Sequence, residues 1–434
     1  MRIAWVTPMA RRSAIGRFSV PVAEALHGRG HRVRIVRCES DPDPAEPIHD
    51  THLPVDLVDR LDPEAFRART DIAVINVGDN YLFHGGIFRM LEIMPCAGVF
   101  HDFYLMNLFN GWAAARGATA NDYENAIVET YGPQAREMAG RARTGELPLA
   151  TIAANLPMTE WVARRCAGAL AHAQFYTPRL AAACAGPVDF AHLTMEARDV
   201  DPLPPRDRGE VVIATVGVMN PNKCADAVIE AIGDSPLLRE RAAYRLIGPI
   251  SDDERARLQG LADARGYKGL TIFGSVDDET LADQLQDADV ICCLRKPVLE
   301  GASASAVEAL LSGRPTIVAD AGFYGEIPDD YALKVPADVP PAALTAQLER
   351  LAGDEALRRE TGARAQAWAK DHFSLDRYVD RCEALIRETV DAQPILEIGA
   401  ALGHELAGFG LGPDDPAVAR IAGLVETMFP RARL

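Results

Sequence analysis

At 434 residues the chain is too long for one ordinary hydrophobic core, and its 48% hydrophobic and 25% charged residues are typical of a folded globular protein. A formal net charge of −17 argues against a nucleic-acid binder, and no apolar run approaches the roughly 20 residues that cross a bilayer. Eight scattered cysteines without a CxxC pair, and an N-terminus without signal-peptide features, favour a cytoplasmic protein that has neither a zinc site nor a disulfide framework.

The chain opens with the pattern of a βαβ unit. Strands are predicted over Arg2 to Thr7 and Arg32 to Arg37, with a helix from about Arg17 to Arg29 between them. This order predicts a doubly wound parallel sheet. The first strand-to-helix turn holds one glycine, Gly16, and no GxGxxG, so the dinucleotide fingerprint is absent. Gly16 fits a phosphate or acceptor contact about as well as a plain tight turn.

Two further strands of the first half, Asp71 to Val77 and Ala97 to Phe100, end in polar clusters. Ligands of open α/β sheets bind at the carboxyl ends of strands. We therefore predict that these clusters line a ligand site: Asp79, Asn80 and His84 after the first strand, and His101 and Asp102 after the second. A later strand, Ala169 to Thr177, carries His172, for which we expect a structural role.

A second αβ pattern begins after a proline-rich segment, 196–209, which is predicted to be the interdomain linker. The strand Val211 to Gly217 leads through a loop into a helix from about Ala225. Lys223 lies in that loop, where it can pair with a diphosphate beside the helix amides. A solvated surface lysine is the alternative.

The stretch Arg295 to Glu326 contains the most informative pattern. A loop with Glu300 follows an apolar strand and precedes a predicted helix, Ser303 to Leu311, which contains Glu308. Helix amides attract phosphates, and carboxylates accept hydrogen bonds from sugar hydroxyls. The pattern therefore predicts a ligand that has both hydroxyls and phosphates.

The C-terminal part is predicted to be helical. A strongly periodic helix covers 375–390, and the tail reads as two more helices broken between Gly408 and Pro413. Packing on the first domain is the default expectation for the tail, and contact with a partner or a membrane is the alternative. The predicted domain organisation is 1–195 for the first domain, 196–209 for the linker, 210–372 for the second domain, 373–390 for a crossover helix and 391–434 for a helical tail.

These motifs resemble those of retaining glycosyltransferases of family 4, in particular a bacterial subgroup. The resemblance covers about residues 1–390. It rests on Glu300-x7-Glu308 with Leu294-Arg295 before it and Ser312-Gly313-Arg314-Pro315 behind it, on Gly217 to Lys223, on Phe273-Gly274, and on the strand-end motifs Gly78-Asp79-Asn80 and Phe100-His101-Asp102. It implies an α/β protein of the GT-B type, with two facing Rossmann-like domains, a cleft between them and a C-terminal helix that crosses back.

The resemblance also implies roles on the sugar side of a nucleotide-sugar donor. Glu300 matches the carboxylate that contacts the donor sugar, with help from the backbone amides of Gly301, Ala302 and Ser303. Glu308 matches the carboxylate that holds the ribose.

Other positions match the diphosphate side. Lys223 corresponds to the lysine that stabilises the leaving group, and Gly16 to a loop glycine near the phosphates. Gly217 and Asn222 belong to the same donor motif, and Arg295 is expected to share the leaving-group charge.

The implied activity is transfer of a sugar from a nucleotide-diphosphate donor to a glycan or lipid-linked acceptor, with retention and without a metal or cofactor. His101 matches a histidine near the transferred sugar. The implied process is cell-surface polysaccharide synthesis, and a lipid-linked acceptor would bring the protein to the inner face of the membrane. The sequence does not define the oligomeric state.

The chain departs from the family pattern at two positions. Val218 stands where many members have arginine, and Leu299 where the subgroup usually has glycine. Two alternatives stay open: a nucleotide-sugar epimerase of the same fold, and a non-catalytic partner subunit. An NAD-dependent enzyme is the least favoured, because neither half contains GxGxxG.

Overall fold

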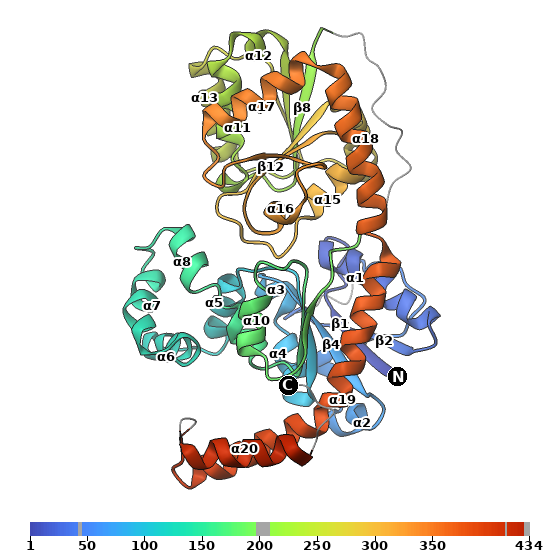
Figure 1. Cartoon of the computed structure of the whole chain (residues 1–434), viewed down its shortest axis with the longest axis vertical. Coiled ribbons are helices and arrows are strands. Elements are labelled where there is room, and N and C mark those ends of the chain that lie inside the picture. The colour runs from blue at the N-terminus through green and yellow to red at the C-terminus, as the bar shows by residue number, and fades with distance from the viewer. Residues whose placement is uncertain (42–45, 197–208, 413–414, 429–434) are drawn as a thin grey trace. The chain divides into compact units, whose positions relative to one another are not determined.

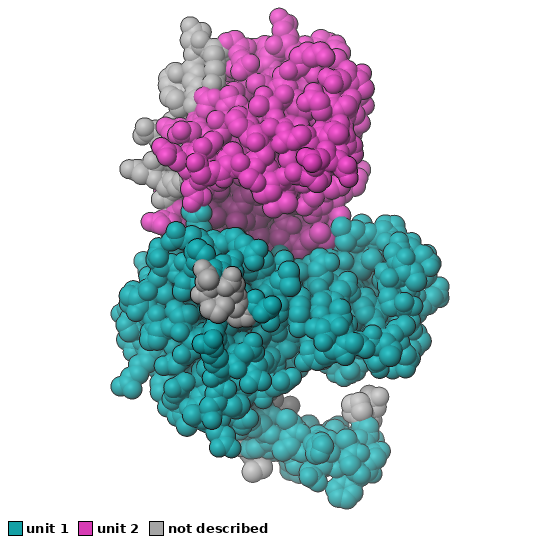
Figure 2. Space-filling view, turned by 180° about the vertical axis from the view of Figure 1, so that it is seen from behind, with its two compact units in different colours: residues 1–191, 376–434 teal, residues 192–375 magenta. Residues whose placement is uncertain are grey.

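Two parallel sheets are built from the apolar runs of the chain, one in each of two units. Unit 1 consists of Met1–Ala191 and Asp376–Leu434, and unit 2 of His192–Leu375 (Figure 2). The computed structural model describes residues 1–41, 46–196, 209–412 and 415–428. The predicted linker, 196–209, therefore lies almost entirely outside the described residues.

The sheet of unit 1 has seven parallel strands in the order β3-β2-β1-β4-β5-β6-β7 (Figure 1). Its strands are β1 (Arg2–Thr7), β2 (Arg32–Arg37), β3 (Val55–Leu57), β4 (Ile72–Val77), β5 (Cys96–Phe100), β6 (Gly168–Ala171) and β7 (Val188–Phe190). The central β4 is buried along its whole length, as the continuous apolar runs of parallel sheets require, whereas the short edge strands are half-buried.

The helices and 3-10 turns of unit 1 are α1 (Ala14–Gly28), η1 (Val58–Arg60), α2 (Pro63–Ala68), α3 (Tyr81–His84), α4 (Ile87–Ile93), α5 (Met106–Ala115), α6 (Ala120–Tyr131), η2 (Pro133–Ala135), α7 (Arg136–Arg143), α8 (Leu149–Asn155), α9 (Thr159–Ala163), α10 (Thr177–Ala183), α19 (Leu375–Gly408) and α20 (Pro416–Met428).

Two predicted boundaries were wrong. The first helix begins at Ala14 because Ser13 caps it, accepting a hydrogen bond from the Gly16 amide at 3.0 Å. The strand expected to reach Thr177 ends at Ala171.

Helix α19 is longer than the sequence predicts, because it continues past residue 390 to Gly408 with Pro394 inside it. Its buried side chains end at Ile395. Ion pairs attach the first turns of α19 to the N-terminal segment of unit 1: Arg29 Nη1 lies 2.6 Å from Asp380 Oδ1, and His31 Nε2 lies 3.0 Å from Glu383 Oε1.

Replacing Glu383 with glutamine should weaken this attachment in the neutral pH range. Hydrogen bonds from Arg387, His31 and Arg29 lower the pKa of Glu383 to about 2 from its usual 4.5, against a smaller opposing effect of burial. Since the folded-state pKa lies below the unfolded one, the stabilisation is complete above about pH 4.5 and is lost as the pH falls toward 2. We expect a loss of about 1 kcal/mol at pH 7, the scale of exposed ion pairs.

Thermal unfolding of the wild type and Glu383→Gln should therefore differ at pH 7, and the difference should narrow toward about pH 3. Glu388→Gln is the matched control, because Glu388 is an exposed residue of the same helix. A difference in Tm between the two proteins that stays constant from pH 7 to pH 3 would contradict the role given to the ionised Glu383.

Unit 2 holds a six-stranded parallel sheet in the order β10-β9-β8-β11-β12-β13. Its strands are β8 (Val211–Val216), β9 (Ala242–Ile247), β10 (Leu270–Gly274), β11 (Val290–Cys293), β12 (Thr316–Ala319) and β13 (Leu333–Val335). Its helices and 3-10 turn are η3 (Pro221–Lys223), α11 (Ala225–Asp234), α12 (Pro236–Arg241), α13 (Asp252–Ala264), α14 (Asp278–Asp287), α15 (Ala304–Leu311), α16 (Gly322–Glu326), α17 (Pro341–Gly353) and α18 (Glu355–His372). Glu326 ends the short helix α16.

Each sheet has a point at which the strand order reverses, between β1 and β4 in unit 1 and between β8 and β11 in unit 2. Doubly wound sheets bind ligands beyond the carboxyl ends of the strands at such a point. In unit 2 the flanking loops are those that follow β8 and β11, which contain Lys223 and Glu300. The predicted α/β class with two Rossmann-like units is thus confirmed.

The remaining composition-based expectations concern cysteines and membranes. All eight cysteines are buried and free. Within the described ranges, no helix combines the length and the apolar character that a membrane crossing requires.

Candidate functional site

Lys223 lies where the chain leaves the central strand of unit 2. It ends the 3-10 turn η3, and its Nζ donates a hydrogen bond of 2.8 Å to the carbonyl of Val216. Gly217 makes room for this ammonium group: its φ is 109°, and a Cβ there would lie 2.7 Å from Lys223 Nζ. The strand-end glycine therefore permits a lysine to fold back over the strand.

The ammonium group of Lys223 is poorly hydrated. Burial, followed by the charge of Arg295, lowers the pKa of Lys223 from its usual 10.5 to about 7. A buried cation that its surroundings disfavour gains strongly from an incoming anion. The site is therefore suited to a phosphate group.

The loop after β11 carries a buried ion pair. Arg295 Nε lies 2.7 Å from Glu300 Oε1, and Arg295 Nη1 donates to the Leu294 carbonyl at 2.7 Å. Tyr324, from the short helix α16, donates its hydroxyl hydrogen to the same Glu300 oxygen. The side chains of Arg295 and Glu300 are 8% and 17% exposed, so solvent screens this pair weakly.

Both partners keep their charges. Burial raises the pKa of Glu300, but Arg295 and the Tyr324 hydroxyl lower it further, so that it ends below its usual value. Burial lowers the pKa of Arg295, and Tyr324 and Glu300 more than reverse that effect. With Lys223 nearby, the three charges sum to +1 when the lysine is protonated, which favours an anionic ligand.

The other predicted donor residues lie around this pair. Ser303 caps α15, accepting from the Ala306 amide at 3.3 Å, and the Asn222 carbonyl accepts from the Lys296 amide at 2.9 Å, which joins the two loops. Gly301 and Ala302 are buried in the loop, and Glu308 is half-buried within α15. The contacts of these residues with a nucleotide sugar stay predictions.

In unit 1, His101 lies at the end of β5 with both ring nitrogens engaged. Its Nε2 lies 2.9 Å from Asn76 Oδ1, and its Nδ1 lies 3.1 Å from Nε2 of His172. His172 follows β6, and its Nδ1 lies 3.1 Å from the carbonyl oxygen of Ala191. The sequence thus points to one histidine, and the structure places two side by side.

Asp79 and Asn80, which follow β4, form hydrogen bonds that hold neighbouring helices and loops in place. Asp79 accepts hydrogen bonds from the Asn107 and Leu108 amides at 2.8 and 3.0 Å, at the start of α5, and its own amide donates to Asp102 Oδ2 at 2.8 Å. Burial and the Asp102 charge raise the pKa of Asp79 to about 8. Asn80 caps α3 by accepting from the Leu82 amide at 3.0 Å.

Two more predicted residues support the loops at the switch point of unit 1. His84 is buried, its Nδ1 donates to the Asn76 carbonyl at 2.9 Å, and burial lowers the pKa of His84 to about 4. Gly16 lies in the first turn of α1, where a Cβ would meet the Pro8 carbonyl oxygen at 2.4 Å. Acceptor contacts by Asp79, Asn80, His84 and Asp102, and a phosphate contact by Gly16, stay predictions.

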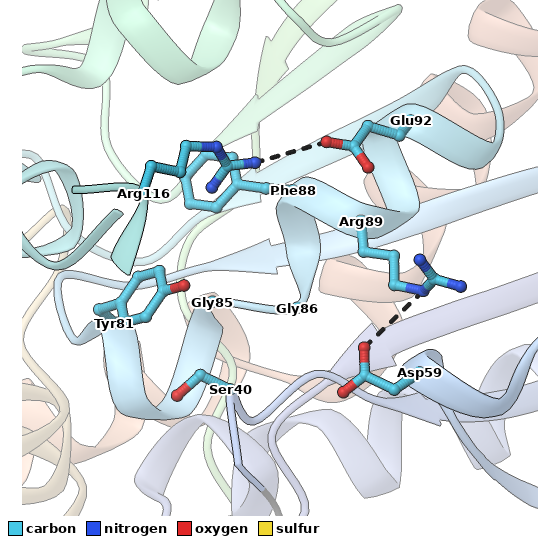
Figure 3. Close-up of a pocket in the computed structure, with 9 residues that line it drawn as sticks. All are labelled: Ser40, Asp59, Tyr81, Gly85, Gly86, Phe88, Arg89, Glu92 and Arg116. Atoms are coloured by element: carbon cyan, nitrogen blue, oxygen red, sulfur yellow. Dashed lines mark hydrogen bonds and ion pairs between the residues drawn. The ribbon is translucent and has the colours of Figure 1, made fainter. Parts of the chain in front are cut away.

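A pocket of about 190 Å³ opens elsewhere in unit 1, beside α3 and α4 (Figure 3). Its polar lining includes two ion pairs, Arg89 Nε with Asp59 Oδ1 at 3.7 Å and Arg116 Nη2 with Glu92 Oε1 at 3.4 Å. Its lining residues are Ser40, Asp59, Tyr81, Gly85, Gly86, Phe88, Arg89, Glu92 and Arg116.

Among the described residues, no group of three His, Cys, Asp or Glu side chains is placed to hold a metal ion. Tyr324 and Asn76, which contact Glu300 and His101, were not predicted from the sequence. Asn76 is hidden inside an apolar strand, where a polar residue is itself a signal, whereas Tyr324 is one of several aromatic residues that follow strand ends.

Comparisons with known proteins agree with this geometry. The sequence model of the family described as Glycosyl transferases group 1 matches residues 201–368. These residues therefore form a glycosyl transferases group 1 domain, which spans most of unit 2. No curated protein matches the chain in sequence.

Among solved structures, the chain is similar to sucrose-phosphate synthase from Thermosynechococcus elongatus, with 17% identity, a TM-score of 0.62 and coverage of 90% of this chain and 100% of that one. A glycosyltransferase from Rickettsia africae ESF-5 has 13% identity, a TM-score of 0.60 and coverage of 90% and 98%. HepE from Anabaena, solved in complex with UDP and glucose, has 12% identity, a TM-score of 0.58 and coverage of 89% and 99%. At such identities the likeness shows the fold alone.

Proposed function

We propose that the protein is a glycosyltransferase that moves a sugar from a nucleoside-diphosphate donor to a glycan or lipid-linked acceptor with retention of configuration. The observation that carries the proposal is the group of Lys223, Arg295 and Glu300 on the two loops at the switch point of unit 2. This group lies inside the matched glycosyl transferases group 1 domain. Two cations and one carboxylate suit a ligand with phosphates and hydroxyls.

In the proposed reaction, the bond between the anomeric carbon and the phosphate oxygen breaks while the acceptor oxygen attacks the same face. The departing phosphate accepts the proton of the acceptor hydroxyl, so no protein nucleophile is needed. Lys223 stabilises the negative charge that develops on the phosphate, and Glu300 holds the hydroxyls of the donor sugar. Catalysis then consists of positioning and electrostatic stabilisation.

We assign donor binding to unit 2 and acceptor binding to unit 1, where polar residues follow β4 and β5. We propose the acceptor class and the process, cell-surface polysaccharide synthesis, on the resemblance of the strand-end motifs to those of the bacterial subgroup. A lipid-linked acceptor would bring the protein to the inner face of the membrane as a peripheral protein.

A thermal-shift screen against UDP-, GDP-, ADP- and dTDP-sugars tests the donor assignment. A ligand at 100 times its Kd stabilises the folded protein by about 2.7 kcal/mol. For a domain the size of unit 2, this corresponds to a rise in Tm of roughly 5–10 °C. We expect one nucleotide class to give this shift, and the absence of any shift would contradict the proposal.

The donor that binds is then incubated with the protein, with and without a lipid or glycan extract. A transferase releases nucleoside diphosphate in step with a glycosylated product, and only when an acceptor is present. Conversion of the donor sugar without an acceptor would indicate the epimerase alternative. Binding without turnover would indicate the non-catalytic partner subunit.

A further inference from the structure

Four hydrogen-bonding links join two main-chain carbonyls of unit 1 through three side chains. Asn76 Nδ2 donates to the Val6 carbonyl at 3.1 Å, and Asn76 Oδ1 lies 2.9 Å from His101 Nε2. His101 Nδ1 lies 3.1 Å from His172 Nε2, and His172 Nδ1 lies 3.1 Å from the Ala191 carbonyl oxygen. A side-chain amide from β4 and two imidazoles that follow β5 and β6 therefore connect β1 with the residue that follows β7.

While both imidazoles are neutral, the three side chains supply one hydrogen fewer than the four links need. A carbonyl oxygen only accepts, so each outer link needs a hydrogen from the side chain. The amide of Asn76 and each neutral imidazole supply one hydrogen along the chain, which gives three hydrogens for four links. Burial, with His172 beside it, lowers the pKa of His101 well below its usual value, and burial lowers the pKa of His172 to about 4, so both rings are neutral at pH 7.

The Ala191 carbonyl decides where the hydrogens lie. It requires the hydrogen of His172 on Nδ1, so His172 presents a bare Nε2 to His101. If the hydrogen of His101 lies on Nδ1, the unfilled link falls between His101 Nε2 and Asn76 Oδ1. The other tautomer of His101 would set two bare ring nitrogens against each other.

The two arrangements place the unfilled link on opposite sides of His101, which is 8% exposed, whereas His172 and Asn76 are 0% exposed. A hydrogen from a ligand would therefore reach this chain of links at His101.

We propose that His172 is a positioning residue that holds His101 in the Nδ1–H tautomer, so that His101 Nε2 accepts a hydrogen bond from a hydroxyl of a bound ligand. The hydroxyl hydrogen, directed at His101 Nε2 and Asn76 Oδ1, supplies the fourth hydrogen. That this hydroxyl belongs to a sugar rests on the proposed function. The tautomer itself does not depend on it.

The surroundings hold both rings in place. The hydroxyl of Tyr176 accepts from the His172 amide and donates to the Phe100 carbonyl, both at 2.7 Å, which ties the end of β6 to that of β5. The ring of Phe18 packs edge-on against His101 and His172, with centroid distances of 4.9 and 5.5 Å. From α19, Tyr378 packs against His172 at 5.7 Å. Among the titratable neighbours, His84 lowers the pKa of His101, the Tyr176 hydroxyl accepts from the His172 amide, and the Tyr378 ring packs against His172.

Nitrogen-15 NMR of the ligand-free protein with labelled histidines tests the tautomer directly. In the wild type, we expect the His101 Nε2 resonance of a nitrogen without hydrogen, and the Nδ1 resonance of one that carries it. A protonated Nε2 on neutral wild-type His101 would overturn the proposal. Because this measurement uses the wild-type protein, it does not depend on whether the His172 variants fold.

Two substitutions of His172 should separate positioning from packing. In His172→Phe, two links remain for two hydrogens, so the hydrogen of His101 should move to Nε2 and bond to Asn76. In His172→Gln, the amide still accepts from His101 and donates to Ala191, so the wild-type tautomer should persist. Tyr378→Phe is the control, because its hydroxyl has no hydrogen-bond partner among the described residues. Equal spectra for the Phe and Gln variants would overturn the proposal.

Kinetics connect the tautomer to the proposed function. His172→Phe should lower kcat/KM for sugar transfer about tenfold, which corresponds to one hydrogen bond of about 1.4 kcal/mol. His172→Gln should restore most of it, and the Kd for the nucleoside diphosphate should not change. If no sugar transfer is found, the NMR result still decides on the tautomer. If transfer occurs but wild-type His101 carries its hydrogen on Nε2, only the positioning proposal fails.

Discussion

Replacing Lys223 with methionine should reduce sugar transfer at least about 100-fold and, at or below pH 7, should make unit 2 more stable. Removing one group that stabilises developing anionic charge typically costs a factor of about 100–1,000 in kcat. Stability should move the other way because the folded protein holds this ammonium group unfavourably, as its lowered pKa shows. Methionine has a similar length and no charge to desolvate, although the hydrogen bond to the Val216 carbonyl is lost.

The direction of the stability change follows from the difference between the pKa of Lys223 in the folded and the unfolded protein. The pKa of Lys223 is about 7 in the folded protein and 10.5 in its usual environment, so the folded state binds fewer protons between these values. The destabilisation by Lys223 is therefore complete below pH 7 and is relieved as the pH rises toward 10.5. Each pKa unit corresponds to about 1.4 kcal/mol, from which the lost hydrogen bond subtracts about 1 kcal/mol.

Tm measurements of both proteins from pH 6 to 10 should thus show a more stable methionine variant at pH 6, with an advantage that shrinks as the pH rises. Lys268→Met is the matched control: Lys268 is 80% exposed, lies in the same unit, and should change neither activity nor stability. A methionine variant that loses folding in proportion to activity would show that Lys223 is only structural.

Glu300→Gln should abolish turnover of the donor sugar and destabilise unit 2, while nucleotide binding to the folded protein survives. The substitution keeps an acceptor for the Tyr324 hydroxyl but leaves Arg295, 8% exposed, without its counter-charge. Breaking a buried ion pair on one side typically costs about 3–5 kcal/mol.

A double variant separates the two effects. Adding Arg295→Met to Glu300→Gln removes the stranded charge, so stability should largely return while sugar turnover stays lost. Denaturant unfolding and nucleotide titration of the single and double variants measure this, with Glu360→Gln, an exposed glutamate of α18, as the control. Transfer by Glu300→Gln within about twofold of the wild type would remove Glu300 from the proposed site.

The fold could be predicted because alternating strands and helices, each with its own periodicity, are local properties of the sequence. Lys223, Arg295 and Glu300 could be predicted for a related reason: each lies just after an apolar strand, and a parallel sheet brings the ends of its strands to one edge. The roles of these residues in catalysis stay predictions.

The missed contacts depend on distant parts of the chain. Tyr324 reaches Glu300 from a separate helix, and His172 reaches His101 from the next strand of the sheet. The length of α19 could not be predicted because Pro394 normally argues for a helix end, whereas burial up to Ile395 helps to hold this helix against unit 1.

Unit 1 is made from both ends of the chain, with unit 2 inserted between them. Recombination at a single point after residue 191 would therefore exchange more than unit 2, because the segment that begins at Asp376 would come from the other parent. The new α19 would then meet Arg29 and His31 without having been selected with them. An exchange of unit 2 alone between relatives needs two crossovers, one near residue 191 and one near residue 375.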